Sequence, residues 1–419
     1  MTSIFQFIKS GVLYRSRQLV DPIIREIYWL YARRKANEIR KKENISVAFI
    51  VSETALWKSE YLYMKMREHP RFSPIILITP MPDAPKGADQ AVEYCKSKGY
   101  AYHFLEGKET IQSVAHPDII LYQKPYDVSI LPRYGFRRNL KSLFCYVYYS
   151  FHNVKEKATT DTPLTNIAWQ LYYENDEVME FPKQVMKNHN RNGIVTGLPM
   201  TDILTMPIDT YPDPWKKTEK PLKRIIWGPH HSIGNKDHGG INYSTFLEVA
   251  DFMLEMAQTY KDKVQFAFKP HTLLAFNLQE YWSKERIAEY FKAWEEMENT
   301  QLELGGYNGL FMHSDAMIHD SGSFTLEYMY TKKPVMYLLK EPNADHTANQ
   351  TAWAKDAFML HYHGTTKEDI RRFIEQVIAN DDPLKDKRED FYRTSLLPPN
   401  GCSASENIIN AILGIKPYK

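Results

Sequence analysis

The feature that most restricts the fold is a regular alternation of short apolar runs with helical segments, present in both halves of the chain. The buried strands that it predicts are Ile45–Val51, Pro74–Ile78, Tyr102–Phe104, Asp118–Tyr122 and Cys145–Tyr149, then Arg224–Trp227, Val264–Phe268, Ala316–Ile318 and Val335–Leu338. Strands that alternate with helices are typical of parallel sheets covered by helices on both faces. We therefore predict an α/β protein with two Rossmann-like domains that face each other across a cleft.

A segment rich in proline and charge, Thr210–Pro221, divides the two halves. We predict a helical arm over residues 1–42, a first domain over 43–208, a linker over 209–221, a second domain over 222–400 and a terminal helix over 401–419, which could cross back to the first domain. Within the first domain, Ala168–Tyr173 and Pro182–Lys187 are expected to be helical. The 419 residues, 43% hydrophobic and 25% charged, are sufficient for two cores.

The basic charge of the chain is concentrated in the arm. Residues 1–42 carry ten Lys or Arg and three Asp or Glu, while the rest of the chain has a net charge of −5. Pro22 follows Asp21 as a helix start, and Ile23, Ile27 and Leu30 then recur at helical spacing. Basic residues beside apolar ones are typical of a helix on an anionic membrane surface. We predict a cytoplasmic protein bound peripherally to the inner face of the plasma membrane; the alternative is a helix packed on the protein with a solvated basic face.

Composition and motifs argue against several classes of function. The three cysteines, Cys95, Cys145 and Cys402, are far apart, which supports neither a disulfide framework nor a cysteine metal site. Outside the arm the chain is net acidic, which disfavours nucleic acid as a partner. There is no phosphate-loop, GxGxxG or serine-hydrolase motif in the sequence. No required cofactor and no metal site are indicated; Mg²⁺ and homo-oligomerisation stay open.

The segment Ala316–Leu338 is predicted to form a strand, a tight turn, a helix and the next strand. The turn consists of Asp320, Ser321, Gly322 and Ser323. Backbone N–H groups at such a turn favour an anion, and Glu327, on the following helix, could accept hydrogen bonds from a ribose. The segment therefore predicts the phosphate and ribose end of a nucleotide site, with an ordinary capped helix as the alternative.

Polar loops follow two further strands of the second domain. They are His230-His231-Ser232 and Lys269-Pro270-His271. The carboxyl ends of parallel strands lie at one edge of a sheet, so we expect these loops beside the Asp320–Ser323 turn, where they suit a pyrophosphate. His152 follows a strand of the first domain and could take a proton from an attacking hydroxyl; the alternative is a histidine packed under the aromatic run before it.

Five segments then occur in a distinctive order. They are Ile194–Pro199 with Asp202–Leu204, Trp227–Ser232, Phe268–His271, His319–Ser323 continuing through Glu327 to Lys333–Val335, and Gly401–Ile409. This series resembles the CDP-glycerol glycerophosphotransferase family, the teichoic-acid polymerase and primase group, from about Ile194 to the end of the chain. The first domain is similar to the family only in outline, with His152 in the place of a Trp-His-Gly loop.

The resemblance implies a GT-B fold and transfer of glycerol phosphate, or a related polyol phosphate, from a CDP-polyol to a hydroxyl of a lipid-linked or glycan acceptor, with release of CMP. It implies an acceptor-side first domain and a donor-binding second domain. It also implies catalytic histidines at His152 and His271, with donor contacts at Ser321–Ser323.

The sequence departs from the family pattern at three places. Thr272 replaces a proline, His230 and His231 replace a threonine and arginine loop, and Gly322 replaces a tyrosine. The changed turn, with Glu327, also resembles uridine-sugar epimerases and GT-B glycosyltransferases. Two alternatives therefore remain: a glycosyltransferase that uses a nucleotide sugar for capsule or lipopolysaccharide synthesis, and a non-catalytic GT-B scaffold.

Overall fold

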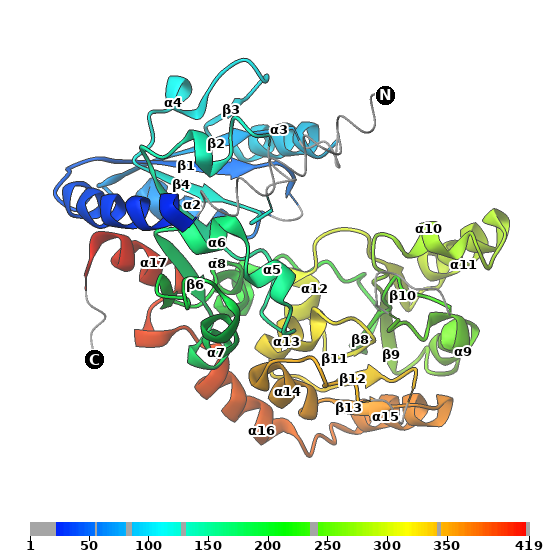
Figure 1. The fold of residues 1–419 in the computed structure, drawn as a ribbon. Helices are drawn as coiled ribbons and strands as arrows, with labels where there is room; N and C mark the ends of the chain where they lie inside the picture. The colour runs from blue at the N-terminus through cyan, green and yellow to red at the C-terminus, as the bar shows by residue number, and fades with distance from the viewer. Residues whose placement is uncertain are drawn as a thin grey trace, which may run out of the picture. The chain divides into compact units, whose positions relative to one another are not determined.

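The computed structural model describes residues 22–54, 57–80, 86–126, 131–234, 242–341 and 345–415 (Figure 1). The chain forms two compact units. The first unit combines the chain up to Ser150 with Glu156–Asp202 and the segment from Pro398 onward, and the second combines Phe151–Lys155 with Ile203–Leu397. None of the described helices has the length and apolarity that a bilayer-spanning helix needs.

The first unit is built on a parallel sheet of seven strands in the order β3-β2-β1-β4-β5-β6-β7. The strands are β1 (Ile45–Val51), β2 (Phe72–Ile78), β3 (Tyr102–Phe104), β4 (Ile119–Tyr122), β5 (Leu143–Val147), β6 (Gln170–Tyr173) and β7 (Gly193–Val195). The helices are α2 (Glu60–Glu68), α3 (Gly87–Lys98), α4 (Ile111–Val114), α5 (Lys157–Thr160), α6 (Pro163–Ile167), α7 (Asp176–Val185), α8 (Pro199–Asp202) and α17 (Ala404–Leu413). The five strands predicted in this half are all present.

The expectation of a helix over Ala168–Tyr173 is wrong, because Gln170–Tyr173 forms strand β6. Every residue from Ala168 to Tyr173 is buried, including the polar Gln170, so the strand has no exposed polar face that would reveal an alternation. A short apolar run of this kind cannot be assigned to helix or strand by its period. Between β5 on one side and β7 on the other, this run is a central strand.

The predicted N-terminal arm divides into two parts. Residues 1–21 lie outside the described residues, whereas residues 22–39 form a helix that packs on the first unit (Figure 1, dark blue). Its buried face includes Tyr28, whose hydroxyl donates to the Ser142 carbonyl oxygen at 2.7 Å and accepts from the Phe144 N–H at 3.1 Å. The other face exposes Ile23, Ile27 and Leu30.

The second unit is built on a six-stranded parallel sheet in the order β10-β9-β8-β11-β12-β13. The strands are β8 (Lys223–Gly228), β9 (Val264–Phe268), β10 (Thr300–Leu302), β11 (Ala316–His319), β12 (Val335–Leu338) and β13 (Tyr362–Gly364). The helices are α9 (Phe246–Thr259), α10 (Leu274–Leu278), α11 (Lys284–Glu296), α12 (Asn308–Met312), α13 (Phe324–Glu327), α14 (Ala352–Met359), α15 (Lys367–Ala379) and α16 (Lys385–Phe391). The sequence pattern predicted β8, β9, β11 and β12 but not the two short edge strands.

The core of the second unit follows the two-residue period of its strands. Trp227 and Phe268 point to one face, where their rings stack with centroids 5.0 Å apart among side chains of α9, α11 and α15. Tyr337 points to the opposite face, where its ring centroid lies 5.2 Å from that of Phe358 on α14. Because both faces are covered by helices, this sheet is accessible to a ligand only at its edges and at the loops that follow its strands.

Two connecting segments are fixed by buried contacts. Residues 209–221, expected as a linker, lie in the second unit, where the Trp215 indole is buried and donates to the Leu310 carbonyl oxygen at 3.3 Å. The C-terminal helix α17 lies in the first unit, where the buried Asp202 carboxylate accepts from Ala404 N at 2.7 Å and Ser405 N at 2.9 Å. Asp202 thus satisfies two N–H groups in the first turn of α17.

We expect Asp202→Ala to destabilise the first unit, because two buried N–H groups lose their acceptor at roughly 1–3 kcal/mol each. Hydrogen exchange of the α17 amides and urea unfolding should both show the loss. Asp209→Ala, at an exposed aspartate, is the matched control and should change neither measurement. Unchanged protection of α17 in Asp202→Ala would contradict the anchoring role.

Candidate functional site

The predicted polar loops of the second unit meet at the carboxyl edge of its sheet, as the parallel topology requires. The loop after β8 lies beside the loop after β9, because the His271 N–H donates to the Pro229 carbonyl oxygen at 3.1 Å. The turn after β11 joins them, because the Asp320 carboxylate accepts from the His230 N–H at 2.6 Å. Three segments far apart in sequence thereby form one surface at the strand ends.

Three histidines form a compact cluster on this surface. The rings of His230 and His231 have centroids 4.2 Å apart, those of His231 and His271 4.3 Å, and those of His230 and His271 5.1 Å. One ring nitrogen of each lies within 4.8 Å of one ring nitrogen of the others. Such proximity would suit either a cation held by nitrogen lone pairs or an anion held by N–H groups.

Local hydrogen bonds orient each ring of the cluster. Nδ1 of His271 accepts from the Leu273 N–H at 3.1 Å. Nδ1 of His231 lies 3.2 Å from the Asn277 side-chain nitrogen, which also donates to the His231 carbonyl oxygen at 2.9 Å. Burial, followed by the charges of His231 and Lys269, lowers the pKa of His271 to about 4. His271 is therefore neutral at physiological pH in this site.

The side chain of Asp320 connects the loop that carries His230 to the start of α9. Besides the His230 N–H, its carboxylate accepts from Thr245 N at 2.7 Å and Thr245 Oγ1 at 3.0 Å, at the start of α9. The side chain is fully buried, and burial raises the pKa of Asp320 to about 6, although these hydrogen bonds oppose the shift. Asp320 therefore positions the backbone of His230, and its predicted contact with the donor stays a prediction.

The turn at Ser321–Ser323 was expected to present a row of N–H groups before a helix, and one of these N–H groups is already used within the protein. The Ser321 N–H donates to Nδ1 of the buried His319 at 3.2 Å, and α13 is only four residues long. The hydroxyls of Ser321 and Ser323 lie 3.3 Å apart. The hydroxyls of both serines can therefore serve an anion, whereas the Ser321 N–H is already used by His319.

Lys269 and Glu327 lie at the ends of β9 and α13. Burial lowers the pKa of Lys269, while Glu303 acts in the opposite direction. Glu327 is buried and accepts a hydrogen bond from Tyr307, whose pKa is raised well above its usual value, first by burial and then by the Glu327 charge. The predicted ribose contact at Glu327 stays a prediction, with Tyr307 as its neighbour.

His152 belongs to the second unit, although it was expected at the edge of the first domain. Its segment pairs with the start of α14: the His152 carbonyl oxygen accepts from Thr351 Oγ1 at 2.8 Å. The next residue contacts the Asp320–Ser323 turn, because Asn153 Nδ2 donates to the Gly322 carbonyl oxygen at 3.3 Å. The backbone of His152 is thus fixed to the same unit as the histidine cluster.

Four residues that the sequence did not single out as site residues support the predicted ones. They are Asn153, Tyr243, Thr245 and Asn277. The Tyr243 ring lies 5.7 Å from that of His230, and a Cβ added to Gly322 would lie 3.6 Å from the Tyr243 ring. Tyr243 therefore lies beside the position where the family pattern has a tyrosine. Asn153 directly follows the predicted His152, but no local motif marks the other three residues, because each contact joins distant segments.

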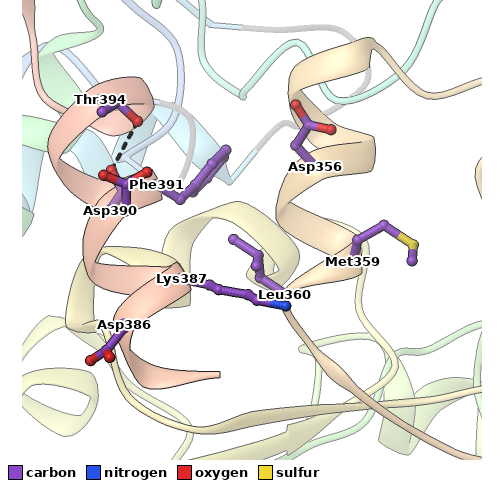
Figure 2. A pocket seen from close by; sticks show the side chains of 8 residues that line it. All are labelled: Asp356, Met359, Leu360, Asp386, Lys387, Asp390, Phe391 and Thr394. Carbon is purple, nitrogen blue, oxygen red and sulfur yellow. Dashed lines mark hydrogen bonds between the residues drawn. The ribbon is translucent and has the colours of Figure 1, made fainter. Parts of the chain in front are cut away.

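A separate hollow of about 520 Å³ lies between α14 and α16 (Figure 2). Its lining consists of Asp356, Met359, Leu360, Asp386, Lys387, Asp390, Phe391 and Thr394. Lys387 extends toward Leu360, while the three carboxylates lie apart from one another (Figure 2). These eight described residues are all different from the predicted site residues, so the hollow adds nothing to the strand-end site.

Comparison with protein families gives a match that covers residues 35–414. The matching family is described as CDP-Glycerol:Poly(glycerophosphate) glycerophosphotransferase. No curated protein matches the chain in sequence.

Solved structures share the fold at low sequence identity. The wall teichoic acid polymerase TagF is 14% identical, with a TM-score of 0.60 over 98% of this chain and 97% of that one. MnaA of S. aureus, in a co-structure with UDP, is 14% identical, with a TM-score of 0.56 over 90% of this chain and 98% of that one. UDP-GlcNAc 2-epimerase from Neisseria meningitidis, bound to UDP-GlcNAc, is 13% identical, with a TM-score of 0.58 over 89% and 100%. These likenesses confirm the predicted GT-B fold.

We expect Asp320→Asn to weaken donor binding about tenfold, because an amide cannot accept from both the His230 and Thr245 N–H groups. Titration calorimetry with CDP-glycerol measures the change. Asp315→Asn is the matched control, since Asp315 accepts from Arg224 N at 2.8 Å at the opposite edge of the same sheet. Equal loss of affinity in both variants would mean that Asp320 supports only the fold.

Proposed function

The chain belongs to the CDP-glycerol:poly(glycerophosphate) glycerophosphotransferase family, and on that premise we propose that it transfers glycerol phosphate, or a related polyol phosphate, from a CDP-activated donor to a hydroxyl of a membrane-linked glycan or polymer. CMP is released, and the product extends a cell-surface polymer. The observation that carries the proposal is the convergence of His230, His231, His271 and Lys269 at the strand ends of the second unit. Clustered N–H donors with a cation suit the diphosphate of such a donor.

In the proposed reaction, the acceptor oxygen attacks the β-phosphorus of the donor. The bond from the β-phosphorus to the bridging oxygen breaks, and the electron pair leaves with CMP. Phosphoryl transfer depends mainly on positioning and on stabilising charge on the phosphoryl oxygens. Lys269 and the Nε2–H of neutral His271 supply that stabilisation, and His152 accepts the proton of the attacking hydroxyl.

The donor is tested directly by turnover. Purified protein is incubated with a lipid-linked acceptor and, in turn, CDP-glycerol, UDP-sugars and CMP-sugars. We expect consumption of CDP-glycerol with stoichiometric CMP release. Release of UDP from a nucleotide sugar, with CDP-glycerol untouched, would instead support the glycosyltransferase alternative, which the fold likeness to UDP-GlcNAc 2-epimerases and Gly322 favour.

Substitution of the two proposed catalytic histidines should separate their roles. We expect His271→Ala and His152→Ala each to lower kcat by about 100-fold or more, the usual effect of removing a group that acts in the transition state. His271→Ala should also weaken donor binding, whereas His152→Ala should leave it unchanged. His103→Ala is the control, because His103 pairs with Glu109 in the first unit. Full activity of either catalytic variant would remove that residue from the mechanism.

We further propose that the helix over residues 22–39 binds an anionic membrane surface at the inner face of the plasma membrane. Ile23, Ile27 and Leu30 are 63%, 64% and 68% exposed, and they form an apolar stripe beside exposed Arg33 and Arg34. Apolar side chains flanked by basic ones suit an interfacial helix. The opposite face of the helix packs on the first unit. Packing on the protein and binding to a membrane are therefore compatible for this helix.

Replacing Ile23, Ile27 and Leu30 together by serine should reduce binding to vesicles that contain anionic lipid, without unfolding the protein, because all three are exposed. Vesicle co-sedimentation measures the loss, and turnover with a soluble acceptor should persist. Ile208→Ser with Met359→Ser, at exposed apolar residues elsewhere, is the control. Unchanged vesicle binding by the triple variant would exclude this stripe as the membrane contact.

A further inference from the structure

Family membership does not determine whether the cluster of His230, His231 and His271 binds a cation or an anion. Among the described residues, this cluster brings together three side chains that could hold a metal ion, and it contains neither a carboxylate nor a thiolate. A cation site of three imidazoles would need a lone pair directed at the ion from each ring. The hydrogen bonds of each Nδ1 show which nitrogen of a neutral ring keeps that lone pair.

Two of the rings have their Nδ1 lone pair already occupied. The Leu273 backbone N–H can only donate, so Nδ1 of His271 accepts, and the proton of the neutral ring is on Nε2. The Asn277 amide donates to the His231 carbonyl oxygen and presents the same nitrogen to Nδ1 of His231. In the neutral form both rings therefore carry their proton on Nε2, and an Nε2–H suits an anion and not a metal ion.

His230 differs because its Nδ1 faces a hydroxyl. Nδ1 lies 2.8 Å from Ser232 Oγ and 3.3 Å from the Ser232 N–H. Ser232 Oγ also accepts from the Tyr243 N–H at 2.9 Å, and a hydroxyl oxygen can accept two hydrogen bonds. The hydroxyl can therefore turn to accept an Nδ1–H, so that His230 can hold a second proton at the cost of the longer Ser232 N–H contact.

We propose that His230 takes up a proton from solvent when the donor diphosphate binds, while His231 and His271 bind it as neutral Nε2–H donors. The inference rests on the proposed function and gives the mode of donor binding in this site. A diphosphate diester brings two negative charges, which favour the imidazolium form of His230. The proton adds to Nδ1 of His230, and no covalent bond of the donor changes in this step.

Among the described residues, charged and titratable groups lie near His230 on each of the three strand-end loops. His231 is adjacent, His271 and Lys269 lie on the loop after β9, Asp320 accepts the His230 backbone N–H, and Tyr243 faces the ring. Without a ligand, Lys269 opposes a second positive charge. Donor binding thus favours the protonated form of His230, so binding is strongest at low pH and weakens as pH rises.

Titration calorimetry with CDP-glycerol, without acceptor, tests the proposal. The measurement is made at one pH in buffers of different ionisation enthalpy, so that the slope of the observed enthalpy gives the protons taken up. Both phosphates of CDP-glycerol are strongly acidic, so the ligand does not titrate near neutral pH. We expect uptake of up to one proton per donor, and affinity that falls by up to about tenfold per pH unit as pH rises. Binding without proton uptake would overturn the proposal.

Variants identify the proton acceptor. We expect His230→Asn to abolish the uptake and flatten the pH dependence, and Ser232→Ala to diminish the uptake by removing the acceptor of Nδ1–H. His231→Asn and His271→Asn should weaken binding but retain proton uptake. Uptake that persists in His230→Asn would overturn the assignment, as would loss of binding with a chelator that Zn²⁺ restores.

UDP-GlcNAc, titrated in parallel, separates the inference from the proposed function. Binding of UDP-GlcNAc with proton uptake, and no binding of CDP-glycerol, would overturn the donor assignment but support the proton coupling. Binding of CDP-glycerol without proton uptake would support the donor assignment but overturn the proton coupling. Failure of both diphosphates to bind would overturn both proposals.

Discussion

The buried carboxylate of Asp320 is the interaction on which the strand-end site depends. It holds the His230 N–H and the start of α9 at the end of β11, so loops that follow different strands share one anchor. Burial raises its pKa to about 6, and the N–H and hydroxyl donors around it limit that shift. A buried acceptor that must satisfy several donors can move little, so its hydrogen bond also restrains the backbone of His230.

The charge of the site follows from what surrounds this anchor. The cluster consists of imidazoles, and burial lowers the pKa of its neighbour Lys269. The arginine that the family pattern places in this loop would carry a permanent charge. With His230 and His231 in its place, the site has N–H donors but little fixed charge, so in the proposed binding mode a dianionic ligand induces the positive charge on His230.

Parallel topology explains why much of this could be predicted from the sequence. Once β8, β9 and β11 are recognised as parallel strands, His230, Lys269, His271 and Asp320 must lie at one edge. The sequence cannot show contacts that join unrelated segments, such as Asn277 with His231, or Phe151–Lys155 with residues beside α14. Strand β6 was missed for a different reason: it is buried on both faces, and a short run whose one amide side chain, Gln170, is also buried has no period to detect.

The arrangement also explains why donor identity is difficult to derive from this edge of the sheet. The contacts proposed for His231, His271, Lys269 and the serine hydroxyls are to the diphosphate, which every nucleoside-diphosphate donor possesses, and solved structures with the same fold contain UDP or UDP-GlcNAc. Family membership, not the diphosphate site, therefore favours the CDP-polyol. At Gly322 the side chain of Tyr243 lies beside the position of the family tyrosine, so an aromatic ring is retained near the turn although it comes from another loop. The change at Gly322 consequently argues less against a CDP-polyol than the sequence alone indicates.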